Sequence, residues 1–281
     1  MNETSRENHK AVDGPRPVAA LSLGNLLNET FAIYWGHFGR IIVLVALVQV
    51  PVNFFGLVPL HGLAGFFVVG VVSLVAGICV YGAVIWGVGQ HYVTGEIEIE
   101  GCYRRVSWRV MSLGALAVAL ATLGLVSDYM ASTAITSQSA GLGVLFLVLG
   151  TAFLIVTVYL MVTPQAVILE GLRPLDALKR SFTLLRNSWW RVFGVALVLL
   201  LVLMGLALVL TIPFGVASGL AAPGETNAVG DAFVFLAGMT VSVFVPPVLS
   251  IATTLLYFDL RVRKEDYDTE ALSREMGLVT T

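Results

Sequence analysis

Charged side chains are scarce in this sequence, and the places where they are missing indicate its fold class. Of the 281 residues, 12% are Asp, Glu, Lys or Arg and 57% are hydrophobic. Soluble domains carry roughly 25% charged residues, so about half of the usual water-facing charge is absent. A soluble fold of this length could not cover its apolar side chains, whereas a lipid bilayer solvates them. The composition therefore predicts an integral membrane protein.

Cysteine and secretory targeting features are also largely missing. The two cysteines, Cys79 in an apolar run and Cys102 in a polar connection, do not form a disulfide framework or a CxxC metal motif. Residues 1–20 are polar and lack the apolar segment of a cleavable signal peptide. We predict that they form a disordered cytoplasmic tail.

Three long runs with almost no charge predict six transmembrane helices in an all-α fold. Residues 41–95 contain no charged side chain, 110–169 contain only Asp128, and 192–258 contain two acidic residues. A spanning helix needs roughly 20 apolar residues, so each run accommodates two helices and a turn. Barrel strands would show alternating polarity instead. The expected spans are 41–57, 63–88, 110–126, 142–162, 192–210 and 233–257, within a membrane domain of residues 21–264 followed by a cytoplasmic tail of residues 265–281.

The positions of the basic residues predict the orientation of these spans. All 16 lysines and arginines fall in four groups, at residues 6–40, 104–109, 173–191 and 261–274. Six spans place all four groups on one side, which the positive-inside rule assigns to the cytoplasm, whereas five or seven would move at least one group across. We therefore expect a plasma-membrane protein with both termini in the cytoplasm.

Two amphipathic segments precede spans and suggest an internal repeat. Apolar residues spaced three and four apart predict helices in the headgroup layer. They are Leu23, Leu27, Phe31, Tyr34 and Phe38 in one segment, and Leu175, Leu178, Phe182, Leu185 and Trp189 in the other. The segments align at an offset of 151 residues, and residues 96–109 resemble a shorter copy. We predict three hairpins, each preceded by an interfacial helix, with chance similarity as the alternative.

Polar residues near the membrane have structural interpretations. Gln49 and Asn53 share a helix face and are expected to contact a neighbouring helix, with cavity lining as the alternative. Glu170 and Asp259, at inner span ends, are expected to pair with a nearby arginine such as Arg173 or Arg261. Asp128 is expected at a solvated outer end. Prolines are expected to bend or break the helices that contain Pro51, Pro164, Pro213, Pro246 and Pro247.

Basic residues at the inner span ends are expected to anchor the protein to anionic lipid headgroups. These anchors are Arg40, Arg109, Arg191, Arg261, Arg263 and Lys264. Nucleic-acid binding is disfavoured because the inner side has 16 basic and 15 acidic residues. No motif predicts a catalytic, cofactor or metal site, so we expect no enzymatic activity and no cofactor. The expected partners are membrane lipids and a cytosolic or membrane protein.

Two stretches carry a family resemblance. They are residues 166–182, continuing to Trp189-Trp190-Arg191, and residues 255–268, which contain the distinctive Tyr257-Phe258-Asp259-Leu260-Arg261. Together they resemble the membrane domain attached to some glycerophosphoryl diester phosphodiesterases, and related stand-alone prokaryotic membrane proteins. The resemblance implies a membrane-embedded domain over roughly residues 20–275. It does not imply phosphodiesterase activity, because that chemistry belongs to a separate barrel domain and fold-level analogy cannot supply it.

Two functional hypotheses follow. The first is a non-enzymatic envelope scaffold or lipid-associated membrane protein. The alternative is a transporter or permease subunit for an apolar or amphiphilic solute. A membrane enzyme would require a convergent polar cluster inside the bundle.

Overall fold

The chain is all-helical in the part that the computed structural model describes, which comprises residues 18–58, 62–106, 114, 118, 133, 140–221 and 228–278. No strand occurs among these residues, so the predicted all-α class is confirmed for them. The elements are α2 (Leu23–Gly36), α3 (Phe38–Phe55), α4 (Gly62–Thr94), α5 (Ile99–Val106), α7 (Ala140–Leu160), α8 (Thr163–Gln165), the π-helix η1 (Ala166–Glu170), α9 (Pro174–Leu185), α10 (Trp189–Ala221), α11 (Ala228–Glu265) and α12 (Thr269–Met276).

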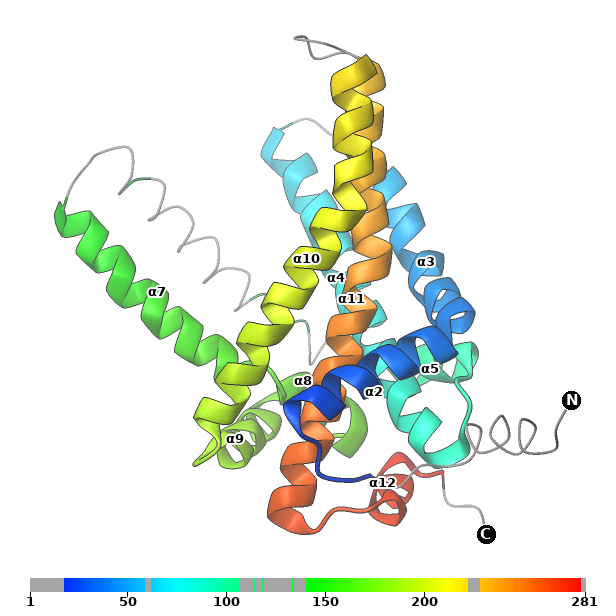
Figure 1. Cartoon of the computed structure of the whole chain (residues 1–281), viewed down its shortest axis with the longest axis vertical. Helices are drawn as coiled ribbons and strands as arrows, with labels where there is room; N and C mark the ends of the chain where they lie inside the picture. The colour runs from blue at the N-terminus through cyan, green and yellow to red at the C-terminus, as the bar shows by residue number, and fades with distance from the viewer. Residues whose placement is uncertain are drawn as a thin grey trace, which may run out of the picture.

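Among the described residues, five helical segments are long and apolar enough to cross a membrane. They are Phe38–Phe55, Val68–Thr94, Leu147–Glu170, Trp189–Leu220 and Ala228–Glu265. They correspond to five of the six predicted spans, and the predicted span 110–126 lies outside the continuous described segments. In Figure 1, α10 and α11 run side by side in the upper half and separate towards the lower end, and α7 diverges from a shared base. Helices α3 and α4 also contact α11. This arrangement is the one expected of a membrane-embedded protein.

The prolines, which were predicted to bend or break their helices, differ in their effect. Helices α3, α10 and α11 continue through Pro51, Pro213 and the Pro246–Pro247 pair, so these prolines do not break their helices. Of the prolines named above, Pro164 is the one that accompanies a helix break in the described residues, where α7 gives way to α8 and η1. Gly171 then ends η1 with a φ of 73°, a left-handed conformation that glycine adopts at low cost. This break turns the chain into α9 at the base of the bundle.

The packed core lies at the end of the bundle that carries α2, α5, α9 and α12, which is called the base (Figure 1). The described basic residues gather at this same end. Every residue of α11 from Ser250 to Arg261 is buried. Towards the opposite ends of the helices, large apolar side chains are exposed, for example Leu147 (65%), Val209 (67%) and Leu220 (78%). Exposed apolar surface of this extent is unfavourable in water and favourable against lipid. The base therefore holds the helices together, and their outer parts present a lipid-compatible surface.

Helices α2 and α9 bury residues in the same register. The buried residues of α2 are Leu26, Thr30, Ile33 and Tyr34. Those of α9 are Ala177, Ser181, Leu184 and Leu185, each 151 residues further along the chain. The following helices also begin 151 residues apart, at Phe38 and Trp189. The shared register supports the predicted repeat of a short helix followed by a span.

Helix α5 keeps part of this pattern. It begins at Ile99 and buries Cys102 and Val106, which lie three and seven residues after its first residue. In α2, the buried residues Leu26 and Thr30 also lie three and seven residues after the first residue, Leu23. It has eight residues, against 14 in α2. This agrees with the shorter third copy predicted from residues 96–109.

Helix α9 buries two small residues together with Leu184 and Leu185, and leaves two other large apolar residues exposed. Ala177 and Ser181 are fully buried, whereas Leu175 is 72% exposed and Phe182 is 44% exposed. The apolar face predicted from the sequence is thus partly free of protein contacts. A helix with this distribution suits the membrane interface, where lipid covers the outer apolar residues.

Parts of both predicted tails are ordered and pack against the base. The backbone N–H of Val18 donates to Thr269 Oγ1 at 3.1 Å, so the ordered base includes residues within the predicted tail 1–20. In the predicted tail 265–281, α12 is capped by Asp268, whose Oδ1 accepts from the Ala271 N–H at 2.8 Å. Its apolar residues Leu272 and Met276 are buried against the base. Short amphipathic segments of this kind become ordered because the base offers them an apolar surface.

Candidate functional site at the charged base

The first polar cluster is centred on Asp259 of α11, whose side chain is fully buried. Its Oδ2 accepts hydrogen bonds from Arg191 Nε (3.1 Å) and Nη2 (2.8 Å) at the start of α10. Its Oδ1 accepts from Arg263 Nε (2.9 Å) and from the backbone N–H of Leu21 (2.7 Å). Both arginines also donate to the Leu21 carbonyl, at 2.5 Å and 3.2 Å. One carboxylate therefore joins the segment before α2 to α10 and α11.

The second polar cluster joins η1, α9 and α11 through Arg180. Its Nε donates to both oxygens of Glu170, at 3.1 and 3.2 Å. Its two terminal nitrogens donate to Glu265 at 2.5 and 2.7 Å. Burial alone would lower the pKa of the Arg180 guanidinium, but the bonds to Glu265 and Glu170 outweigh it and raise that pKa. Arg180 therefore remains a permanent cation in this cluster.

Arg261 extends the second cluster to the C-terminal helix. Its terminal nitrogens donate to Glu275 of α12 at 2.7 and 2.9 Å, and its Nε donates to Glu265 at 3.0 Å. Its guanidinium lies 3.6 Å from the ring centroid of Tyr267, a cation–π distance. The Tyr267 hydroxyl donates to Glu275, and burial raises the pKa of this phenol, so it stays protonated at neutral pH. These contacts hold α12 against the base.

Two further contacts complete the base. Lys264 Nζ donates to the carbonyls of Thr183 (3.4 Å) and Arg186 (2.5 Å), which satisfies the C-terminal end of α9. The Tyr257 hydroxyl donates to Glu170 from within α11. The charged groups of the base are thus satisfied mainly by one another and by helix ends.

The predicted headgroup anchors occupy different environments. Arg261 has a side chain only 6% exposed among carboxylates, so the prediction that it faces headgroups is wrong. Arg191, Arg263 and Lys264 are bound to protein groups, as described above. Arg40 is different because its side chain is 49% exposed, with Nη1 3.8 Å from Glu96 Oε2. Arg109 lies outside the described residues, as does Asp128.

The intramembrane pair predicted from sequence makes a contact between helices. Asn53 Nδ2 of α3 donates to Ser242 Oγ of α11 at 3.0 Å and to the Gln49 carbonyl at 2.7 Å. Gln49 therefore enters this contact through its backbone. Glu170 and Asp259 each pair with arginines, as the sequence predicted. The partners of Asp259 are Arg191 and Arg263, which differ from the arginines that the sequence suggested.

A buried polar contact that the sequence did not indicate lies between α4, α8 and α11. Tyr81 Oη and Thr253 Oγ1 are 2.8 Å apart. The Gln165 side-chain oxygen accepts from Thr253 Oγ1 at 2.9 Å, and its amide donates to the carbonyls of Met161 and Val162 at 3.3 and 3.1 Å. Gln165 thereby bonds two backbone carbonyls at the break after α7. A glutamine beside a proline in an apolar run is the only sequence feature that could have indicated it.

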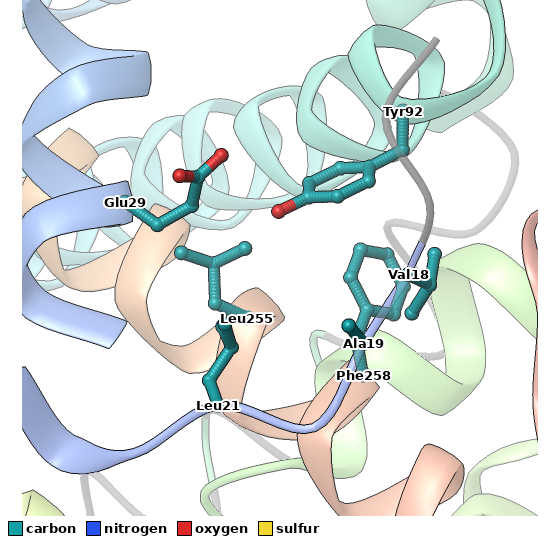
Figure 2. Close-up of a pocket in the computed structure, with 7 residues that line it drawn as sticks. All are labelled: Val18, Ala19, Leu21, Glu29, Tyr92, Leu255 and Phe258. Carbon is teal, nitrogen blue, oxygen red and sulfur yellow. The ribbon is translucent and has the colours of Figure 1, made fainter. Parts of the chain in front are cut away.

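A small pocket lies beside the Asp259 cluster. It has a volume of about 130 Å³ and is lined by Val18, Ala19, Leu21, Glu29, Tyr92, Leu255 and Phe258. Figure 2 shows the Glu29 carboxylate and the Tyr92 hydroxyl turned towards each other across it. A space of this volume accommodates a few water molecules. Five of its seven lining residues are apolar, so the pocket is a small gap in the packing of the base.

The described residues contain no group of three or more His, Cys, Asp or Glu side chains that could hold a metal ion. The geometry of the charged base is that of a structural junction, in which buried ions are satisfied by paired hydrogen bonds. Comparisons of the chain with protein-family models, curated proteins and solved structures gave no match.

Proposed function

We propose that this chain is a non-enzymatic, lipid-associated scaffold protein of the plasma membrane. In this proposal six spans form three hairpins, each preceded by an interfacial helix, and both termini lie in the cytoplasm. The observation that carries it is the charged base, which ties α9, α10, α11 and α12 together while the outer helix surfaces remain apolar. Such a construction fixes a defined intracellular surface on a lipid-facing framework.

The resemblance to the glycerophosphoryl diester phosphodiesterase membrane domain supports the same proposal. Both stretches that carry it contribute to the base. The first supplies Glu170, Arg180 and Arg191, and the second supplies Asp259 and Arg261. The similar residues are thus those that join the helices, as expected if the resemblance reflects a shared membrane framework.

A transporter or permease subunit is the alternative, and the contact of Asn53 argues against it. The side-chain amide of Asn53 is used to bond Ser242 on a neighbouring helix, which is a packing role. A solute pathway would instead present such polar groups to a cavity. We therefore favour the scaffold.

Reconstituted vesicles test this proposal. The purified chain should retain phospholipid through detergent extraction and should produce no saturable flux of a fluorescent lysophospholipid across the vesicle membrane. Saturable flux that is lost in the Gln49→Ala and Asn53→Ala variants, but kept in a Thr151→Ala control, would show transport and overturn the scaffold. Thr151 is suited as the control because its hydroxyl is exposed and bonds only its own helix at the Leu147 carbonyl.

A further inference from the structure

A polar cavity lies where the α2–α3 junction meets the end of α4. It has a volume of about 480 Å³ and is lined by Gly36, His37, Gly39, Arg40, Gly95 and Glu96. A Cβ atom placed on Gly36 or Gly39 would meet no other atom within 4 Å, so these two glycines border open space. The cavity therefore has room for a group larger than a few water molecules.

The charges around this cavity are only loosely paired. Arg40 Nη1 and Glu96 Oε2 are 3.8 Å apart, and their side chains are 49% and 76% exposed. The Nδ1 atom of His37 is buried without a hydrogen-bond partner in the part of the chain that the structure describes. The His37 ring packs edge-on against His91, with ring centroids 4.6 Å apart. The cavity thus offers one cation and one anion, Arg40 and Glu96, for hydrogen bonding.

The internal repeat provides a comparison for this site. Arg40 corresponds to Arg191 at the offset of 151 residues, but Arg191 donates at 2.8 Å to the fully buried Asp259. In the second copy, formed by α9 and α10, the arginine is therefore bound to a buried carboxylate. In the first copy, formed by α2 and α3, the equivalent Arg40 is half exposed. Gly39 corresponds to Trp190, so the first copy also has the smaller residue at that position. The difference between the copies singles out the first as the open one.

The position of the cavity relates it to lipid. Arg40 lies in the first turn of the membrane-length segment Phe38–Phe55, and Glu96 follows the segment Val68–Thr94 by two residues. Val43 and Leu47, three and seven residues after Arg40, lie on the same face of α3 and are 54% and 61% exposed. A lipid whose headgroup occupies the cavity could therefore place an acyl chain against the exposed side chains of Val43 and Leu47.

We propose that this cavity binds the zwitterionic headgroup of an aminophospholipid, an inference that rests on the lipid-associated function proposed above. Arg40 donates hydrogen bonds to the phosphate, and Glu96 accepts hydrogen bonds from the primary ammonium. The paired charges favour a zwitterion, since an anionic headgroup would meet the Glu96 carboxylate unbalanced. The lipid is held at the inner leaflet, with one acyl chain along Val43 and Leu47.

Native mass spectrometry of the full chain in detergent tests this site. The probes are phosphatidylethanolamine, phosphatidylcholine and phosphatidylglycerol with identical acyl chains, together with inorganic phosphate as a competitor. We expect phosphatidylethanolamine to bind about tenfold tighter than the other two lipids, because only its ammonium donates hydrogen bonds to Glu96. Arg40→Gln and Glu96→Gln should each weaken its binding by about tenfold, because each removes a charge-assisted hydrogen bond.

Matched variants separate the cavity from general surface charge. Arg173→Gln and Glu100→Gln remove one charge each from neighbouring parts of the base and should leave the binding unchanged. Gly39→Trp should fill the cavity without altering charge and weaken binding. Gly24→Trp, at a glycine that also borders open space, should not.

Three results would overturn the inference. They are equal binding of phosphatidylglycerol and phosphatidylethanolamine, unchanged binding in Arg40→Gln and Gly39→Trp, and displacement of the lipid by millimolar inorganic phosphate, which would indicate a free-anion site. If phospholipid still co-purifies with every variant in these cases, the lipid-associated function stands and only the headgroup site fails. Absence of co-purifying phospholipid from the unmodified chain would instead remove the proposed function itself.

Discussion

At the scale of single residues, Asp259 shows how a buried charge is tolerated. Moving a carboxylate out of water is costly unless hydrogen bonds and opposite charges replace its hydration. Asp259 receives four such bonds, three from arginines and one from the Leu21 N–H. Its role is to join segments that are distant in the sequence, and stability should depend strongly on it.

Replacing Asp259 with alanine should lower the free energy of unfolding by about 3–5 kcal/mol, because Arg191 and Arg263 would lose their counter-charge in the base. Denaturant titration in detergent, followed by circular dichroism, measures this change. In the control Glu270→Ala, which removes a mostly exposed partner 3.9 Å from Arg274, the change should stay below about 1 kcal/mol. Similar losses in both variants would contradict the role assigned to Asp259.

The sequence predicted the kind of interaction at Asp259 but not its members. An acidic residue at an inner span end beside basic residues indicates an ion pair. Arg191 and Leu21 lie 68 and 238 residues away, so only the tertiary arrangement brings them to this carboxylate. For the same reason, the burial of Arg261 could not be inferred from its position in a basic group.

At the scale of helices, two glycines of α4 allow other parts of the base to pack closely against this helix. A Cβ on Gly82 would lie 2.9 Å from Val106 Cγ1 and 3.2 Å from Ile168 Cδ1. A Cβ on Gly89 would lie 2.8 Å from Met276 Sδ and 3.0 Å from Leu169 Cδ2. Both contacts are too short, but the valine is stiff and the methionine is flexible.

We therefore expect Gly82→Ala to destabilise the protein by about 1–3 kcal/mol through overpacking. Gly89→Ala should cost less, because Met276 can move aside and alanine favours the helix. Thermal unfolding of both variants in the same detergent compares them directly. A larger loss in Gly89→Ala would show that α12 is fixed more rigidly than its side-chain contacts suggest.

Helix positions were more predictable than helix ends and breaks. Long apolar runs located five membrane-length helices correctly, because a span requires a minimum number of apolar residues. The same rule does not limit helices that continue into polar surroundings, and α11 runs on to Glu265 beyond the predicted end at residue 257. Whether a proline breaks a helix depends on neighbouring contacts, such as those Gln165 makes beside Pro164, and these are not visible in the sequence.

At the scale of the whole molecule, the distribution of charge suggests one orientation, and cysteine labelling can test it. Cys102 is a poor reporter because it is fully buried. Burial, together with the negative charge of Glu98, raises the pKa of its thiol to about 12. Maleimide labelling of Cys102 should therefore remain slow from pH 7 to pH 9, even in permeabilised cells, because the reactive thiolate is not formed.

In a Cys79→Ser background, Ser137→Cys should react with an impermeant maleimide in intact cells, whereas Arg173→Cys should react only after permeabilisation. The expected difference follows from six crossings with all basic groups inside. Labelling yield on a gel provides the measurement. Equal reactivity of the two positions from one side would contradict six crossings.

The contact between Leu21 and Asp259 also has a consequence for biosynthesis. Because its two partners are 238 residues apart, the ribosome must complete nearly the entire polypeptide before this bond can form. Until then the inserted helices lack the junction that aligns their inner ends, and a chain terminated before α11 never acquires it. Membrane insertion and final assembly are therefore separate steps in the biosynthesis of this chain, and the second requires α11.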